Sequence, residues 1–82
     1  MNKAYELPLD KLQKGKKGLI VDILGGYKLV KKLDALGIRK KKEVTKISNM
    51  VMNGPVTIKL NNTNNIAIGR GMAKKIIVKV NE

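Results

Sequence analysis

Apolar residues recur with a helical period in one part of the chain. Leu29, Leu33 and Leu36 follow the i, i+4, i+7 spacing of a single helical face, and Val30 lies beside them. Lysines separate these apolar positions, as on the outward face of an amphipathic helix. We therefore expect a helix over about residues 26–36, with its three leucines in a structural role.

The end of this helix is marked by Gly37. Glycine is the usual residue where a helix closes in a left-handed backbone conformation. Ile38 follows it and is placed to pack back on Leu33, as in a Schellman motif. The helix should therefore stop at Gly37, which we also expect to be structural.

Elsewhere the apolar residues alternate with a period of two, which is typical of half-buried strands. The first such segment, residues 18–24, would place Leu19, Val21 and Ile23 on one face and Asp22 on the other. Four further strands are expected. One begins near Val44, and the other three cover residues 56–60, 66–68 and 76–80.

Three features of the later strands and their connections can be predicted from particular residues. Val44 and Ile47 have opposite parity, so we expect a β-bulge or a strong bend between them. Gly54 and Pro55, which follow Asn53, predict a turn in which both residues are structural. A second turn is expected in the asparagine-rich segment at residues 61–65.

Five short strands joined by tight turns do not suit a parallel sheet. They predict a mainly β fold, a small and strongly bent antiparallel barrel, because closing a sheet removes the edges that invite pairing between molecules. Short helical turns are expected near residues 8–13 and 70–75. No internal repeat or linker is present, so residues 1–82 are expected to form a single domain.

The composition excludes several classes of chemistry. The 82 residues contain no cysteine and no histidine, which excludes a disulfide framework, a zinc knuckle and most transition-metal sites. The aromatic residues are Tyr5 and Tyr27, so the core must consist of Ile, Val, Leu and Met. No apolar stretch approaches the ~20 residues that span a bilayer, and the start lacks an apolar signal core. We expect a cytoplasmic protein.

The charge of the chain is strongly positive. Eighteen Lys and Arg residues against six Asp and Glu residues give a formal net charge of +12. Such a charge attracts nucleic acid, an anionic membrane or an acidic protein partner. A lysine-rich surface that only keeps the chain in solution explains the same value, so charge alone assigns no function.

Two glycine-rich segments resemble phosphate-binding loops only superficially. Residues 69–74 have Lys74 where the dinucleotide-binding pattern needs a third glycine, and no βαβ unit surrounds them. Residues 15–18 have no following Ser or Thr, so they are no P-loop. We expect no GTP hydrolysis by this chain.

Other candidate groups give no support for catalysis. Asp22, Asp34 and Glu43 are spread over different expected elements without a histidine, which leaves open only an all-oxygen site for a hard cation; pairing with lysines is the simpler interpretation. Ser48 has no base near it in sequence. We therefore expect no enzymatic activity, no cofactor and no resident metal.

The order of these pieces resembles the FeoA family, the small cytosolic component of bacterial ferrous iron transport. The matching pieces are a strand with a glycine pair (residues 20–26), a helix end of the pattern basic-Leu-x-x-Leu-Gly-apolar (32–38) and a Gly-Pro-Val turn (54–56). They are followed by two strands (58–60 and 66–68), a helical Ala (73) and an Ile-x-Val strand (76–78). The resemblance implies an SH3-like barrel with an inserted helix. It also implies a non-enzymatic protein that docks on the cytosolic part of the ferrous iron permease with a GTPase domain.

One position departs from that family. The family usually has a glycine in the turn that follows the helix-capping glycine, where this chain has Lys40 and Lys41. If Lys41 needs a positive φ, lysine costs roughly 1 kcal/mol there. Either the turn type has changed or strain is tolerated.

The candidate partner site is a positive surface on the helix and the following turn. It would face an acidic partner, and it consists of Lys28, Lys31, Lys32, Arg39, Lys40, Lys41 and Lys42.

Two alternatives stay open. Basic barrels of this shape bind RNA or a ribosomal partner, and Lys16 and Lys17 with residues 39–42 would line one edge of the barrel. Sequence-tolerant binding of single strands also uses aromatic stacking, worth ~1–3 kcal/mol per base, yet no expected strand carries an aromatic residue. The chain also resembles the SH3-like regulatory domain at the end of iron-dependent repressors, here detached from any DNA-binding chain.

Overall fold

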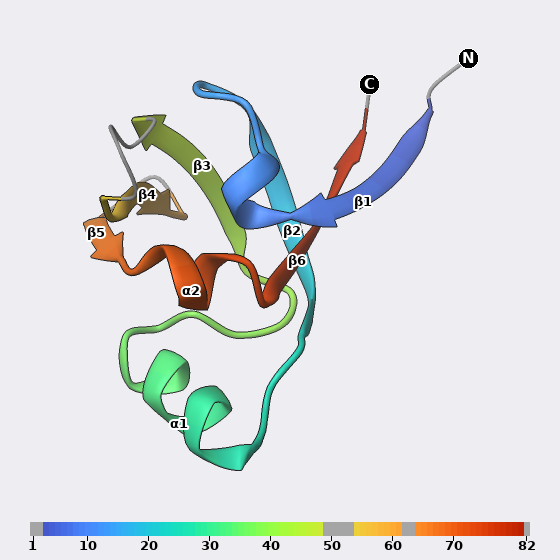
Figure 1. The fold of residues 1–82 in the computed structure, drawn as a ribbon. Coiled ribbons are helices and arrows are strands. Elements are labelled where there is room, and N and C mark those ends of the chain that lie inside the picture. The colour runs from blue at the N-terminus through green and yellow to red at the C-terminus, as the bar shows by residue number, and fades with distance from the viewer. Residues whose placement is uncertain (1–2, 49–53, 62–63, 82) are drawn as a thin grey trace.

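The computed structural model describes residues 3–48, 54–61 and 64–81. In this part of the chain, antiparallel strands form one sheet in the order β1-β6-β2-β3-β4-β5 (Figure 1). The strands are β1 (Ala4–Pro8), β2 (Lys17–Ile23), β3 (Glu43–Ser48), β4 (Val56–Leu60), β5 (Asn64–Ile68) and β6 (Ile76–Asn81). The mainly β class expected from the sequence is confirmed.

The sheet differs from the expected five-stranded barrel in two ways. It has a sixth strand, β1, which pairs with β6 from Ala4 opposite Asn81 to Pro8 opposite Ile77. Within the described residues, no pairing joins the outer strands β1 and β5, so the sheet is curved but not closed. Strand β1 escapes detection because its side chains are mostly exposed and show no apolar alternation. Pro8 is compatible with it because an edge strand tolerates a residue without an N–H.

Strand β2 buries a different face from the one expected. Ile20 and Ile23 are buried, whereas Leu19 is 42% exposed. The change of face follows from a shift in the pairing with β6. Ile20 lies opposite Val78, and the next paired residue, Asp22, lies opposite Ile77. One extra residue, Val21, is thus inserted as a β-bulge. The prediction of Leu19, Val21 and Ile23 on one inward face was wrong.

Strand β3 contains the expected β-bulge. The register shifts between Lys46, opposite Ile58, and Ser48, opposite Thr57, so Ile47 is the extra residue. Val44 is fully buried on one side of this bulge and Ile47 is half-buried. The parity conflict read from the sequence is therefore resolved by an inserted residue.

The remaining strands follow their sequence patterns. Strand β4 buries its alternate residues from Val56 to Leu60, and β6 does the same from Ile76 to Val80. Of the two predicted turns, Asn53 and residues 62–63 lie outside the described residues. Gly54 and Pro55 precede β4 without regular secondary structure.

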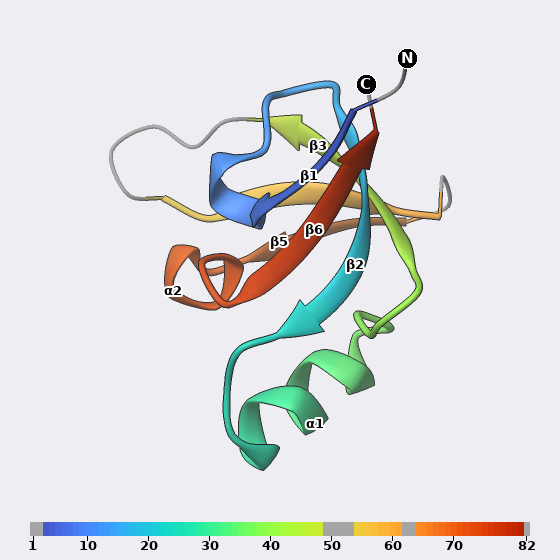
Figure 2. The same cartoon turned by 90° about the vertical axis from the view of Figure 1, so that its right-hand side faces the viewer.

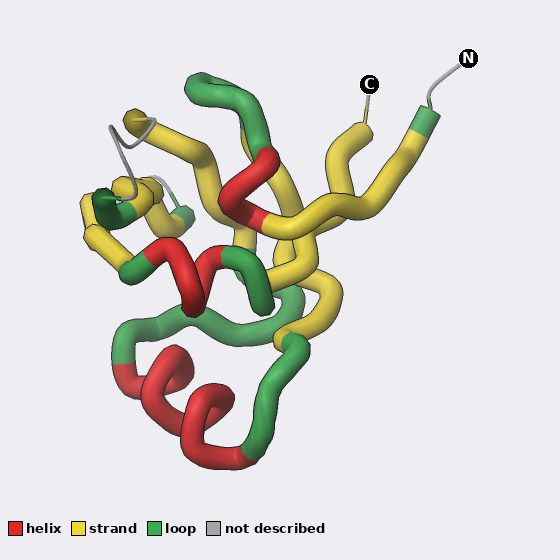
Figure 3. Tube along the Cα trace, viewed as in Figure 1, coloured by secondary structure: helices red, strands yellow, loops and turns green. Residues whose placement is uncertain are grey.

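In the described residues, three short helical elements accompany the sheet. They are η1 (Leu9–Lys11), α1 (Tyr27–Ala35) and α2 (Arg70–Ala73), and each lies where a helix or helical turn is expected. Helix α1 lies apart from the sheet in both Figure 1 and Figure 2. Loop segments lead into it from β2 and out of it to β3, as the green tube in Figure 3 shows.

The core of the described residues is aliphatic. It collects one apolar residue or more from η1, α1, α2 and five of the strands, and it contains no aromatic side chain. Leu9 and Leu12 cover it from η1, and Leu33 and Ile38 reach it from the α1 region. Helix α1 and the loops on either side of it are therefore attached to the sheet through few side chains.

Candidate docking surface

The C-terminal end of α1 is built as a Schellman motif. Gly37 has a φ of +85°, and its N–H donates to the Asp34 carbonyl at 2.9 Å. The N–H of Ile38 donates to the Leu33 carbonyl at 2.9 Å. Leu33 and Ile38 are fully buried, so the apolar contact of the motif is part of the core. The predicted helix end is confirmed.

The other apolar residues of α1 are less buried than Leu33. Leu29 packs against the core while half-buried, Val30 is 39% exposed and Leu36 is 42% exposed. The helix therefore contacts the core through a narrow stripe centred on Leu33. Part of its apolar surface faces solvent.

A basic turn at residues 39–42 follows the helix end and is hydrogen-bonded to β2. The N–H of Lys42 donates to the Arg39 carbonyl at 3.3 Å, which closes the turn. The N–H of Lys41 donates to the Ile20 carbonyl at 2.8 Å, and the Ile20 N–H donates to the Lys42 carbonyl at 2.9 Å. These bonds fix the turn at the end of the β2–β3 ladder.

Lys41 in this turn has a φ of +75°. This left-handed conformation brings the β-carbon of an L-residue close to the following carbonyl oxygen and costs roughly 1–2 kcal/mol. Of the two alternatives raised by the sequence, tolerated strain is the one observed. Lys41 is exposed, and within the described part of the chain its ammonium group has no ion pair or hydrogen bond.

Two ion pairs connect the turn to its neighbours. Arg39 Nε lies 3.1 Å from Asp34 Oδ1 on α1, and Lys40 Nζ lies 3.7 Å from Asp22 Oδ1 on β2. All four side chains are at least half exposed, so each pair contributes about 0–1 kcal/mol. Asp22 and Asp34, two of the three acids considered for a cation site, thus pair with basic residues.

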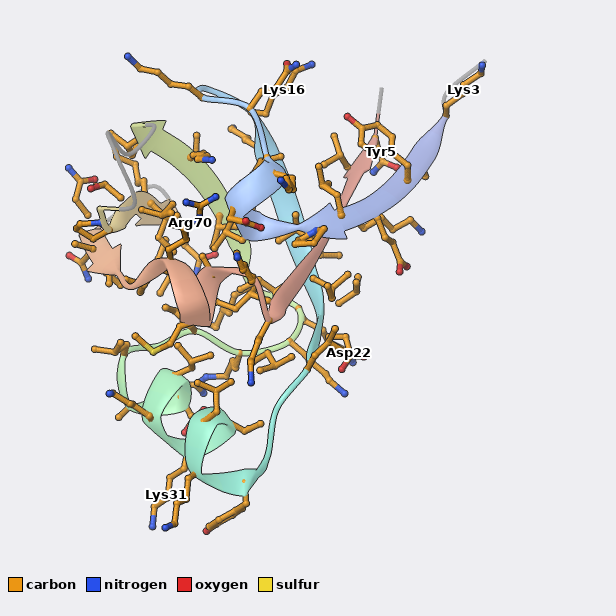
Figure 4. The ribbon with its side chains drawn as sticks, in the orientation of Figure 1. Lys3, Tyr5, Lys16, Asp22, Lys31 and Arg70 are labelled. Atoms are coloured by element: carbon orange, nitrogen blue, oxygen red, sulfur yellow. The ribbon has the colours of Figure 1, made fainter. Side chains whose placement is uncertain are left out.

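The seven predicted partner residues lie on α1 and on the basic turn. Lys28, Lys31 and Lys32 are exposed on α1, and Lys31 Nζ lies 5.8 Å from the centre of the Tyr27 ring. In Figure 4, Lys31 points away from the sheet at the end of the molecule opposite to Lys3 and Lys16. The residues of the turn are exposed except Lys42, which is half-buried. We call these seven residues the basic surface.

A pocket of about 400 Å³ lies beside the basic surface. Ile23 and Val30 give it apolar walls, and it is lined in full by Asp22, Ile23, Val30, Asp34, Arg39 and Lys40. Sequence reasoning missed this pocket. Val30 was grouped with the inward leucines, and no pattern in the sequence places α1 relative to the end of β2.

Sequence reasoning also missed a buried lysine. Lys46 is 4% exposed, and its Nζ donates a hydrogen bond to the Asp10 carbonyl oxygen at 2.9 Å. Burial lowers the pKa of Lys46, Asp10 partly opposes this shift, and Lys11 adds to it. The signal was available, because Lys46 has the parity of the buried Val44. Its role is structural, since the bond ties β3 to η1.

The other candidate groups do not assemble into a chemical site. No group of three or more acidic side chains that could hold a metal ion occurs among the described residues. Residues 70–73 of the glycine-rich segment form the single turn α2, and residues 17–18 of the other segment begin β2. Ser48 ends β3. In the part of the chain that is described, no helix is long and apolar enough to cross a membrane.

The two basic groups considered for RNA are not contiguous along the sheet. The Lys16 carbonyl accepts a hydrogen bond from the Lys46 N–H at 3.1 Å, whereas the Lys42 carbonyl accepts one from Ile20. They therefore lie toward opposite ends of the β2–β3 ladder. One expectation against RNA was wrong, because Tyr5 lies on strand β1, where it is 40% exposed.

Comparisons with known proteins agree with this geometry. The profile of the FeoA domain family matches residues 7–80. A crystal structure of an iron uptake regulatory protein, FeoA, is 31% identical in sequence, with a TM-score of 0.81 over 93% of this chain and 99% of that one. No curated protein sequence matches the chain at a significant level.

Two more distant structures show the fold. A FeoA-like protein from Clostridium acetobutylicum is 21% identical, with a TM-score of 0.80 over 92% of this chain and 86% of that one. A manganese-dependent transcriptional repressor is 14% identical, with a TM-score of 0.84 over 95% of this chain, which spans 43% of the repressor. The curved sheet with its inserted helix is an SH3-like fold.

Proposed function

The chain belongs to the FeoA family, and we propose that it is a non-enzymatic accessory protein of bacterial ferrous iron uptake, docking on the cytosolic part of a GTPase-containing iron permease. The match of the FeoA domain over residues 7–80 is the observation that carries this proposal. The related structure at 31% identity, named as an iron uptake regulatory protein, supports the same role. We further propose that residues 1–82 act as a single domain in the cytoplasm.

The basic surface is the proposed contact with the permease. It gathers seven of the eighteen basic residues on one helix and one turn, with two carboxylates between them. Opposite charges on a partner would steer the encounter and fix the register of the complex. The mechanism that we propose is regulation by contact with the permease.

Lys41 gives this surface a specific feature. Residues held in unfavourable backbone conformations cluster at functional sites, where the strain is retained for a purpose. Lys41 has a left-handed backbone conformation, and in the described structure its side chain forms no ion pair or hydrogen bond that would offset the strain. We infer that the Lys41 ammonium group is retained for binding.

Charge reversal tests the surface. We expect Lys31→Glu, Lys32→Glu and Lys41→Glu together to weaken binding of the permease's cytosolic domain at least about tenfold and to reduce ferrous iron uptake. The control variant Lys3→Glu, Lys14→Glu and Lys79→Glu changes the net charge equally at exposed lysines outside the surface. If binding and uptake were unchanged in the first variant, or equally reduced in both, the assignment of the surface would be wrong.

A second candidate function is that of a detached regulatory domain. The fold likeness to the manganese-dependent repressor over 95% of this chain favours it. A pull-down from iron-starved cells separates the candidates. Recovery of the permease supports the first proposal, and recovery of a DNA-binding chain supports the second. Recovery of ribosomal proteins, with RNA binding that survives ~200 mM salt, would contradict both.

A further inference from the structure

The pocket beside the basic surface combines apolar walls with a charged rim. Of the two apolar residues that line it, Ile23 is buried, whereas Val30 is 39% exposed. The rim carries two ion pairs, Asp22 with Lys40 and Asp34 with Arg39 (Figure 4 labels Asp22). At about 400 Å³ the pocket lies in the lower part of the range typical of ligand sites.

We propose that this pocket binds an apolar side chain from an acidic segment of the protein partner, with Arg39 and Lys40 binding the carboxylates that flank it. The inference rests on the proposed function and names the chemistry that the partner must present. Val30 and Ile23 contact the apolar side chain, and the basic surface holds the segment around it.

The rim ion pairs leave capacity for partner carboxylates. The contact of Arg39 with Asp34 runs through Nε, and a guanidinium group has five N–H donors. Lys40 Nζ is 3.7 Å from Asp22, which exceeds hydrogen-bond distance. Both pairs are exposed, so exchanging their carboxylates for those of a partner costs little.

The charge around the pocket favours an acidic segment. Arg39 and Lys40 line it together with the two rim carboxylates, Lys41 and Lys42 follow them in the same turn, and the chain as a whole carries a net charge of +12. A segment with carboxylates next to its apolar residue therefore gains electrostatic energy that a neutral or basic segment does not. The exposed apolar surface of Val30 supplies the second half of the recognition, because it loses contact with water when the side chain enters.

Synthetic peptides provide the probe. We would titrate the full chain, labelled with ¹⁵N, with a ten-residue peptide that has one leucine flanked by glutamates. We expect saturable amide shifts at Ile23, Val30, Arg39 and Lys40. A matched peptide with serine for the leucine should bind at least about fivefold more weakly, and one with lysines for the glutamates should not bind.

Two variants of the pocket should change the affinity for the peptide in opposite directions. Val30→Glu should weaken peptide binding about tenfold, because it places a carboxylate on the apolar wall of the pocket. Asp34→Asn should strengthen binding about two- to threefold, because it removes a competing carboxylate from Arg39. The exposed Lys74→Gln outside the surface serves as the control and should leave binding unchanged. Far-ultraviolet circular dichroism confirms that each variant folds.

The outcomes separate the two proposals. If the leucine and serine peptides bound equally, or if Val30→Glu bound like the wild type, the pocket assignment would be overturned, whatever the permease does. If the pocket bound the acidic peptide while the permease domain did not bind the chain at all, the proposed partner would be wrong and the pocket's chemistry would stand. Pocket shifts caused by dilution alone, or by anionic lipid vesicles independently of Val30, would identify a second copy or a membrane instead and contradict the proposal.

Discussion

Gly37 and Lys41 lie four residues apart and share a left-handed backbone conformation, with φ values of +85° and +75°. Gly37 ends a helix in a Schellman motif whose two apolar residues, Leu33 and Ile38, are fully buried, and glycine adopts this conformation without strain. Lys41 adopts nearly the same conformation with a side chain that opposes it. The first position is explained by folding alone, whereas the second is not.

Lys46 shows what an unfavourable lysine looks like when folding explains it. Its burial is costly, but its ammonium group bonds the Asp10 carbonyl and connects two elements. Lys41 has no comparable contact in the described structure. The comparison teaches that a side chain that adds strain without forming a contact of its own marks the residue to test for function.

The largest loss of stability is expected for a substitution of Leu33, the buried residue at the helix end that Gly37 closes. Leu33→Ala should lower the free energy of unfolding by about 2–5 kcal/mol, because Leu33 is fully buried and attaches α1 to the core. Urea denaturation followed by circular dichroism measures the loss. Leu36→Ala, at a position 42% exposed, is the matched control and should cost far less. Equal losses would show that α1 is not held through Leu33.

A smaller loss is expected at Gly37. Gly37→Ala should destabilise the chain by about 1–2 kcal/mol, because alanine is strained at this φ and its β-carbon would lie 3.0 Å from Leu60 Cδ2. The same denaturation experiment measures the change. Gly71→Ala is the control, since its β-carbon would meet open space and its φ is not left-handed. Equal stability of the two variants would contradict the strain expected for alanine at position 37.

A glycine substitution at Lys41 should stabilise the chain, in contrast to the destabilising substitutions at Leu33 and Gly37. Lys41→Gly is expected to raise the free energy of unfolding by at most about 1 kcal/mol, because relief of strain exceeds the added flexibility of glycine in the unfolded chain. Lys41→Asn, which tolerates this φ better than lysine, should give an intermediate value. A destabilised Lys41→Gly protein would contradict the strain that separates Lys41 from Gly37.

Lys46, the third residue of the comparison, predicts a pH effect. Because burial lowers the folded-state pKa of Lys46 below the unfolded value of 10.5, the unfolded state binds more protons between these two values. The stability of the wild type should therefore rise with pH in that window, relative to Lys46→Met. Denaturation of both proteins from neutral pH to about 10.5 measures the difference. A difference that fell with rising pH would reverse the assigned cause.

Local features of the fold could be predicted because local residues determine them. The helix end needs only Leu33, Gly37 and Ile38 in order, and the bulge in β3 follows from the parity of Val44 and Ile47. The helix end is also one of the pieces that carry the family resemblance.

Features that depend on distant pairing could not be predicted. The bulge at Val21 arises from the register of β2 with β6, and β1 exists as a strand only because β6 offers it an edge. The pocket requires α1 to face the end of β2, so its six lining residues share no sequence pattern. Lys41 lies between these cases, because the sequence located the conflict and the structure showed how it is resolved.

The central claim is that Lys41 is retained for docking rather than for folding. The most direct test is a titration of the proposed partner, the cytosolic part of the GTPase-containing iron permease, with the wild type and with Lys41→Gly, in which glycine can keep the left-handed conformation while the charge is removed. The account predicts a variant that is at least as stable as the wild type yet binds about three- to tenfold more weakly, with a smaller dependence on salt. Equal or tighter binding by Lys41→Gly would contradict it.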